Sequence, residues 1–368
     1  MSNSIGRTYR VTSFGESHGR CVGAVVDGCP AGLRLSSEDI QSELDRRRPG
    51  QSAVATSRNE GDRVELLSGV FNGLTTGAPI CTLVWNRDRD SSGYEARRWT
   101  PRPGHADYTA HLRYGGFNDY RGGGRFSGRI TASYVMAGAI AKKLLSEALD
   151  VEVLAHAREI GGLRAREVSP DEIRENAEGN PVQCGDMETA ERMAELIAEN
   201  SEQGDSLGGV VECFTLNLPP GIGDPVFDTL EGDLAKALFA IPAVKAVEFG
   251  LGTGFSSMKG SESNDALTLK DGRIETETNR MGGITGGIST GMPIKVSVTF
   301  KPTPSISLPQ RTVDIERMEE TTIVVEGRHD PCVVPRAVPV VESVVAMVLA
   351  DHALRAGLIP RVLGGEGS

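Results

Sequence analysis

The sequence lacks the usual signatures of metal binding, secretion and membrane insertion. No CxxC pair and no zinc-like spacing of cysteine and histidine occurs among the six cysteines, at 21, 29, 81, 184, 213 and 332. No run reaches the roughly 18 uncharged apolar residues of a membrane-spanning helix, and the N-terminus has no apolar signal segment. These absences predict reduced thiols, no metal site, no membrane partner and a cytoplasmic location.

Net positive charge and stacking aromatic residues are also missing. The formal net charge is −11, and aromatic residues make up 5% of the chain, which disfavours nucleic acid as a partner. The arginines instead gather in short clusters, at 45–50, 87–90, 96–105 and 121–129. Cationic clusters on an acidic protein favour a focused site for a small anion. Solvated loop charges are the alternative for any single cluster, and an RNA-binding module is the alternative for all of them together.

The 368 residues contain no linker-like or low-complexity segment, so we expect one domain over 1–368. Helix end signals, Ala-rich composition and a long apolar run predict helices at 36–48, 129–148, 187–200, 228–241 and 334–356. Strand-like runs lie between them, at 21–28, 63–71, 80–86, 208–218, 243–250 and 293–301. The mixture predicts an α+β fold.

The two parts of the chain show a faint similarity. A strand, a Pro/Gly turn and an acid-started helix recur with Gly32 and Gly221 in equivalent places, and later a Gly-Arg pair precedes a long apolar helix in both. We interpret this as two pseudo-equivalent halves, at about 5–150 and 205–356. Chance similarity is the alternative.

The segment "DYRGGGRFSGRIT" (119–131) places three glycines and several arginines just before a predicted helix. Glycines leave the backbone N–H groups accessible, and a helix N-terminus carries partial positive charge, so the pair can hold a phosphate or carboxylate. Arg125 and Arg129 could add bidentate contacts, and Ser127 and Thr131 could add hydroxyl groups. The pattern matches neither a Walker A loop nor a dinucleotide fingerprint.

Three of the six histidines stand beside glycine and an acidic residue in loops: His18 in "SFGESHG", His105 in "RPGHAD" and His329 in "GRHDP". A histidine in such a loop can reach a ligand, and its pKa suits proton transfer near neutrality. A loop histidine bonded to backbone is the alternative. The other three have ordinary surroundings, and we interpret them as structural or exposed.

Two further segments complete the set of candidate loops. "GGITGGISTG" (282–291) allows close backbone approach to a flat or phosphorylated ligand, and "KPTPSIS" (301–307) combines a lysine with hydroxyl groups in a turn. Arginines, loop histidines and one free carboxylate, without a nucleophile or a metal cluster, indicate an anionic substrate and proton transfer. The residues alone do not identify the substrate or require a cofactor.

Seven of these motifs together resemble the chorismate synthase family. "GESHG", "DRRRPG", "RPGHADYT", "YRGGGRFSGR", "GGITGGIS", "KPTPSI" and "GRHDPC" stand in that family's order, over about residues 5–356. The resemblance implies a β-α-β sandwich, typically a homotetramer. It also implies a lyase that removes phosphate from 5-enolpyruvylshikimate-3-phosphate by 1,4-anti elimination to give chorismate. That reaction needs reduced FMN (FMNH2) without net redox change and belongs to aromatic amino acid biosynthesis.

The resemblance also implies roles for residues. His18 would protonate the leaving phosphate, His105 would manage flavin protonation at N1–C2, and Asp330 would assist N5 in accepting the ring proton. The substrate's anionic groups would be bound by Arg47, Arg48, Arg129 and Arg328. The flavin would contact Arg125, Phe126, Ser127, Ala243, Gly286, Lys301, Pro302, Thr303, Pro304, Ser305 and Arg328.

Two positions depart from the family pattern. Ala53 stands where many members carry an arginine, and Phe126 stands where many carry a serine, so a hydroxyl contact from residue 126 is excluded. Flavin reduction could use NADPH directly, but no nicotinamide fingerprint occurs, which favours an external flavin reductase. Another reduced-flavin-dependent or phosphate-ligand lyase on the same scaffold is the alternative function.

Overall fold

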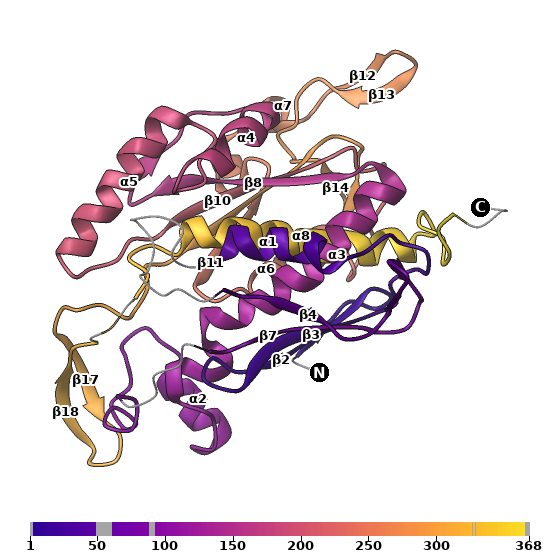
Figure 1. Cartoon of the computed structure of the whole chain (residues 1–368). Coiled ribbons are helices and arrows are strands. Elements are labelled where there is room, and N and C mark those ends of the chain that lie inside the picture. Colours follow the sequence, from indigo (N-terminus) through magenta and orange to yellow (C-terminus); the bar gives the residue numbers. More distant parts are fainter. Residues whose placement is uncertain (1–2, 49–60, 88–92, 326, 328, 365–368) are drawn as a thin grey trace.

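The computed structural model describes residues 3–48, 61–87, 93–325, 327 and 329–364. Two five-stranded antiparallel sheets lie on opposite sides of a helix layer (Figure 1). The first has the order β1 (Ser4–Ile5), β2 (Arg10–Gly15), β3 (Cys21–Asp27), β7 (Ile80–Trp85) and β4 (Val64–Leu66). The second has the order β9 (Leu163–Arg164), β8 (Glu152–Ile160), β10 (Gly209–Leu216), β16 (Ile294–Phe300) and β11 (Val244–Phe249).

The two sheets share one topology. The order β2-β3-β7-β4 corresponds to β8-β10-β16-β11, because in each the third main strand along the chain lies at the edge and the fourth lies inside it. A helix joins the second and third strands in both cases, and a long helix follows the fourth. Alternating residues are buried along β16, as expected for strands that cover a core on one face.

The helix layer contains α1 (Ser37–Arg47), α3 (Thr131–Leu149), α6 (Leu230–Leu238) and α8 (Val334–Arg355). Helix α3 packs against β2, β3 and β7, α8 packs against β8 and β10, and the two helices pack against each other (Figure 1). A Cβ atom on Gly138 of α3 would lie 2.2 Å from the Cβ atom of Ser343 in α8, so glycine permits this close approach. The architecture is the expected β-α-β sandwich.

Helix α8 is apolar and long enough to cross a membrane by length and composition, but 94% of its most apolar window is buried inside the protein. It is therefore the central helix of the core. One charged residue on it, Glu342, is 1% exposed. Arg46 of α1 and Lys142 of α3 form ion pairs with its carboxylate, and the backbone N–H of Ala155 in β8 donates to it at 2.9 Å. This ion-pair network joins three helices to the second sheet.

The five predicted helices are present, with shifted ends. Ser36 and Asp39 form a capping box on α1. Helix α6 is capped by Thr229, whose hydroxyl accepts from the Gly232 N–H. The remaining helices are α2 (Asp107–Tyr114), α4 (Pro170–Asn176), α5 (Met187–Glu202) and α7 (Gly260–Ser263). Of these, only α5 was predicted from the sequence.

Within the described residues, four hairpins extend from the sandwich. They are β5 (Val70–Phe71) with β6 (Leu74–Thr75), β12 (Leu267–Lys270) with β13 (Arg273–Thr276), β14 (Ile284–Thr285) with β15 (Ile288–Ser289), and β17 (Gln310–Asp314) with β18 (Glu319–Ile323). The β12–β13 hairpin projects from one end of the molecule (Figure 1).

Candidate functional site

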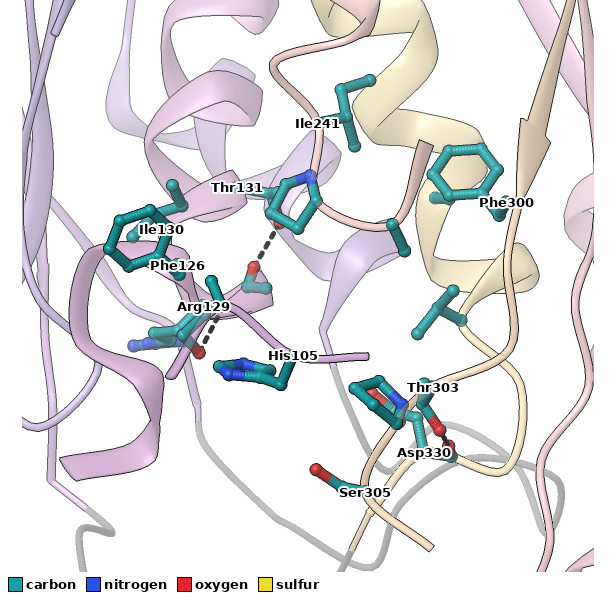
Figure 2. A pocket seen from close by; sticks show the side chains of 18 of the residues that line it. His105, Phe126, Arg129, Ile130, Thr131, Ile241, Phe300, Thr303, Ser305 and Asp330 are labelled. Atoms are coloured by element: carbon teal, nitrogen blue, oxygen red, sulfur yellow. Dashed lines mark hydrogen bonds between the residues drawn. The ribbon is translucent and has the colours of Figure 1, made fainter. Parts of the chain in front are cut away.

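A cavity of about 510 Å³ opens where both halves of the sandwich meet. Its walls come from segments far apart in the sequence, at 102–106, 122–131, 239–245, 300–305 and 329–340. These segments combine connecting loops with the adjoining ends of helices and strands, so the rigid elements of the sandwich position the loops that line the cavity. Figure 2 shows His105 near the middle, with Phe126 and Arg129 on one side and Thr303, Ser305 and Asp330 on the other.

The glycine-rich segment passes between two histidines. Gly122 and Gly123 have φ angles of 58° and 84°, which residues other than glycine rarely adopt. A Cβ atom on Gly122 would lie 2.3 Å from Cδ2 of His18, and one on Gly123 would lie 2.8 Å from Cε1 of His105. Glycine is therefore required here both by backbone conformation and by the space that the imidazole rings occupy.

His105 lies in a polar cluster that we call the His105 clamp, made of Arg102, His105, Asp107 and Ser305. The Nδ1 atom of His105 is 2.6 Å from Oδ1 of Asp107. Arg102 donates to both carboxylate oxygens of Asp107, from Nε at 2.8 Å and Nη2 at 2.9 Å, and from Nη1 to the Ser305 hydroxyl at 3.0 Å. The clamp thus connects the loop before α2 with the turn after β16.

Electrostatics in the clamp favour a neutral imidazole beside an ionised carboxylate. Burial lowers the pKa of His105, and the charges of Arg102 and Lys301 lower it further, while Asp107 opposes them. Burial alone would raise the pKa of Asp107, but the hydrogen bonds from Arg102 and His105 outweigh burial and hold that pKa well below its ordinary value.

His18 lies behind the glycine-rich segment and is 3% exposed. Its ring packs edge-on against Tyr94, with ring centroids 4.9 Å apart. It does not line the cavity, whereas its neighbours Ser17 and Tyr94 do. The backbone N–H of Ser17 donates to the Gly124 carbonyl at 3.2 Å, so the two loops are held together at this wall.

Two buried arginines share one buried carboxylate at the floor of the cavity. Arg47 is 2% exposed and donates to Gly128 O at 2.8 Å, to Thr131 Oγ1 at 3.1 Å and to Asp62 at 3.3 Å. Arg129 forms an ion pair with the other oxygen of Asp62. Burial and the charge of Arg336 lower the pKa of Arg47. Two guanidinium groups on one carboxylate leave local positive charge that suits an anion.

The other predicted arginines have different positions. Arg125 lines the cavity and donates to Gly15 O at 3.0 Å. Arg48 ends α1, lies 3.9 Å from Asp45 and does not line the cavity. Arg328 and the departure at Ala53 lie outside the described residues.

The turn after β16 forms the opposite wall. Lys301, Thr303, Pro304 and Ser305 line the cavity, while Pro302 does not. The Thr303 hydroxyl donates to the backbone carbonyl of Asp330 at 3.0 Å, and the Asp330 carboxylate forms an ion pair with Arg336 of α8. These contacts fix the turn to the start of α8.

Ala243 and Gly286 were both expected beside the ligand. Ala243 lines the cavity with a left-handed φ of 73°, and its carbonyl accepts from Lys301 N–H at 3.0 Å. Gly286 instead turns the β14–β15 hairpin, where the adjacent Gly287 carbonyl accepts from Leu230 N–H at the start of α6. The cavity uses the other end of α6, so Gly286 does not line it within one chain.

The comparisons with known proteins agree on one family. Residues 9–354 match the family model described as chorismate synthase. The chain belongs to the chorismate synthase family. It is 57% identical to the chorismate synthase of Dehalococcoides mccartyi over 363 residues, which are 99% of this chain and 100% of that protein. It is 55% identical to that of Methanothermobacter thermautotrophicus over 366 residues, covering 99% and 97% of the two chains.

A solved structure gives the same result for the fold. A crystal structure of chorismate synthase superposes with a TM-score of 0.76 at 32% identity, covering 98% of this chain and 94% of that one. Family membership makes the chain a lyase of the shikimate pathway with a small-molecule substrate. Among the described residues, no group of three or more histidine, cysteine or acidic side chains could hold a metal ion.

The chorismate synthase motifs in the sequence contain most of the residues that line the cavity, but some residues of the site lie outside them. Asp62, Arg336 and Ile241 lie outside the quoted motifs, and no local pattern distinguishes them from structural residues. Asp62 could have been sought as the counter-charge that two buried arginines require. Tyr94 and Ser17 could have been selected from the sequence, because Tyr94 precedes an arginine cluster and Ser17 adjoins His18.

Proposed function

We propose that the cavity binds reduced FMN together with 5-enolpyruvylshikimate-3-phosphate and carries out the 1,4-anti elimination of phosphate that yields chorismate. The observation that supports this most directly is His105, held by Asp107 and Arg102, in a cavity whose walls carry Arg47, Arg129 and Lys301. A multiply anionic substrate and a flavin phosphate both require such converging cations.

The cavity suits a flavin. Its volume of about 510 Å³ lies within the usual range of ligand sites, roughly 300–1,000 Å³. Phe126, Ile130 and Ile241 supply apolar surface for a flat ring system, while Arg125 and Lys301 supply positive charge for an anionic tail. Gly104, Gly122 and Gly128 keep parts of the wall free of side chains.

Reduced FMN, when bound, would supply electron density that assists cleavage of the C–O bond to phosphate and is then recovered, so that no net redox change occurs. Arg125, Phe126, Ser127, Ala243, the 301–305 turn and Arg328 would hold it. Among the described residues of one chain, the first four of these line the cavity, together with Lys301, Thr303, Pro304 and Ser305. Gly286 would have to contact the flavin from a neighbouring chain of the proposed homotetramer.

The remaining roles concern charge and protons. Arg47, Arg48, Arg129 and Arg328 would bind the phosphate and carboxylates of the substrate, at about 1.5–3 kcal/mol for each charged hydrogen bond. His18 would protonate the leaving phosphate at the wall formed by Ser17 and Tyr94. His105 would exchange a proton with the flavin, and Asp330 would help to receive the proton from the substrate ring.

The proposal extends to the setting of the reaction. We infer a homotetramer in the cytoplasm, supplied with reduced flavin by an external reductase and not by NADPH bound to this chain. Incubation of the purified protein with NADPH and oxidised FMN measures this directly, because flavin bleaching without a reductase would contradict it.

An anaerobic assay tests the main proposal. The protein is mixed with chemically reduced FMN and 5-enolpyruvylshikimate-3-phosphate, and phosphate release and chorismate absorbance are followed together. We expect equal amounts of both products with reduced FMN and neither with oxidised FMN, which serves as the matched control. Phosphate without chorismate, or no product from folded protein that binds flavin, would contradict the proposed reaction.

A further inference from the structure

Arg102 and Asp107 both contact the His105 ring, Arg102 over its face and Asp107 at Nδ1. Arg102 Nη2 is 3.0 Å from Nδ1 and 3.2 Å from Nε2. The two ring nitrogens direct their lone pairs away from each other on either side of Cε1. An atom about equally far from both therefore lies over the face of the ring and not along either lone pair. Asp107 Oδ1, at 2.6 Å, occupies the Nδ1 side.

The Asp107 carboxylate can only accept a hydrogen bond, because it is ionised and already receives two from Arg102. The Nδ1 atom of His105 must then carry a hydrogen, in either charge state of the ring. In the neutral ring, this leaves Nε2 as the nitrogen without a hydrogen. His105 itself lines the cavity (Figure 2).

We propose that Asp107 is a positioning residue for His105: it holds a proton on Nδ1, so that Nε2 is the nitrogen that exchanges a proton with the molecule bound in the cavity. The inference rests on the proposed role of His105. To that role it adds three points: the bound molecule gives the proton to His105, the proton goes to Nε2, and Asp107 stabilises the resulting imidazolium.

The proton balance of this exchange is simple. When Nε2 takes a proton from the bound molecule, the ring becomes an imidazolium and its charge lies 2.6 Å from the Asp107 carboxylate. Asp107 stays ionised throughout, because Arg102 and His105 keep its pKa low. The charged groups that act on the ring are Asp107 from α2, Arg102 from the loop before it and Lys301 from the end of β16. Only the first favours the imidazolium.

The Arg102 fork makes Asp107→Asn an informative change. Arg102 donates to both carboxylate oxygens, and an amide has only one oxygen. That oxygen is expected to stay with the guanidinium, which turns the amide NH₂ toward Nδ1. A donor opposite Nδ1 requires Nδ1 to accept, so the ring proton moves to Nε2, as in other histidines that lose a carboxylate partner.

Nitrogen-15 NMR of the histidine rings tests the proposal without turnover. The full-length protein, labelled at histidine, is studied at pH 8 without flavin, and the His105 signals are identified by their loss in His105→Gln. We expect the proton on Nδ1 in the wild type and on Nε2 in Asp107→Asn and in Asp107→Ala. A wild-type ring with its proton on Nε2 would overturn the proposal, even if neither variant folds.

A titration in the same spectra gives a second result. The pKa of His105 should fall further in both Asp107 variants, because burial, Arg102 and Lys301 remain while the opposing carboxylate is lost. Thr109→Ala is the matched control: its hydroxyl donates to Ala106 O in the first turn of α2 and does not touch His105. The control should leave both tautomer and pKa unchanged.

Steady-state kinetics then separate this inference from the proposed function. Asp107→Asn should lower kcat by roughly 10–100-fold with little change in KM, as is usual for a group that orients a functional side chain. A tautomer change with unchanged turnover would support the positioning role and remove His105 from the reaction. Loss of turnover with an unchanged tautomer would overturn the positioning role and leave the proposed function intact.

Discussion

Gly122 and Gly115 have nearly the same backbone conformation but different surroundings. Their φ angles are 58° and 60°. A Cβ atom on Gly122 would lie 2.3 Å from His18, whereas one on Gly115 would have its nearest neighbour, Phe117, at 3.8 Å. The two positions therefore separate the cost of backbone strain from the cost of displacing a histidine.

We expect Gly115→Ala to lower the free energy of unfolding by about 1–2 kcal/mol, the cost of a left-handed conformation, with turnover unchanged. Gly122→Ala should cost more stability and should also abolish most turnover, because His18 or the glycine-rich segment must move. Denaturant unfolding and the anaerobic assay measure both effects. Equal turnover in the two variants would show that the position of His18 does not matter.

Among the helices, the critical polar contact is the ion-pair network around Glu342. Burial would raise the pKa of this carboxyl group, but Arg46 and Lys142 outweigh burial and lower the pKa to about 2. A carboxyl group whose pKa is lower in the folded protein stabilises it above the unfolded pKa of about 4.3. That stabilisation is lost as the pH falls from there toward 2.

Glu342→Gln should lower the free energy of unfolding at pH 7 by about 1.5–3 kcal/mol, because Arg46 and Lys142 lose the buried carboxylate that they share and keep only pairs with more exposed carboxylates such as Glu43. It should also flatten the decrease of stability between about pH 4.3 and pH 2. Glu147→Gln is the control, since its carboxylate is half exposed and lies 3.8 Å from Lys143, and should change stability by less than about 0.5 kcal/mol. If the free energy of unfolding decreased with acid in the same way in the wild type, Glu342→Gln and Glu147→Gln, the low pKa assigned to Glu342 would be contradicted.

At the scale of the whole molecule, exposed apolar surface supports the proposed homotetramer. Leu267, Leu269 and Ile274 lie on one face of the β12–β13 hairpin and are 75%, 78% and 69% exposed. A two-stranded hairpin with an uncovered apolar face is marginal in water, and such patches often mark interfaces between subunits.

Light scattering of the purified protein should therefore give about four times the 39.2 kDa of one chain, with or without flavin. Gly286 is proposed to contact the flavin but does not line the cavity of its own chain. This is a further reason to expect that neighbouring chains lie near each other's sites. A mass of one chain at the concentration of the activity assay, with full activity, would contradict the homotetramer.

The matching order of the two sheets supports, for the whole chain, the proposed pair of pseudo-equivalent halves. The structure shifts the second boundary, because β8 (Glu152–Ile160) occupies the place of β2 and precedes residue 205. Superposition of β2-β3-α1-β4-β7-α3 on β8-β10-α6-β11-β16-α8 tests this proposal, and a failure of these elements to align would reject it.

The sequence by itself determined the local elements and the family. Capping at Ser36, the apolar composition of α3 and α8 and strand alternation are encoded within a few residues, so the sequence sufficed for them. The motif order was specific enough to identify the family, since its loops carry fixed chemistry at fixed places. Short helices such as α2 were missed because packing, more than periodicity, stabilises them.

Only the tertiary structure decided which of these residues meet. Asp62 pairs with Arg47 and Arg129 through contacts 15 and 67 residues apart in sequence, and no local pattern reports such distances. The backbone path of the glycine-rich segment places His18 behind Gly122. The length of α6 separates Gly286, which lies near the start of that helix, from the cavity at its other end. The Nδ1 partner of His105 likewise follows from side-chain geometry, since residue order fixes neither ring orientation nor tautomer.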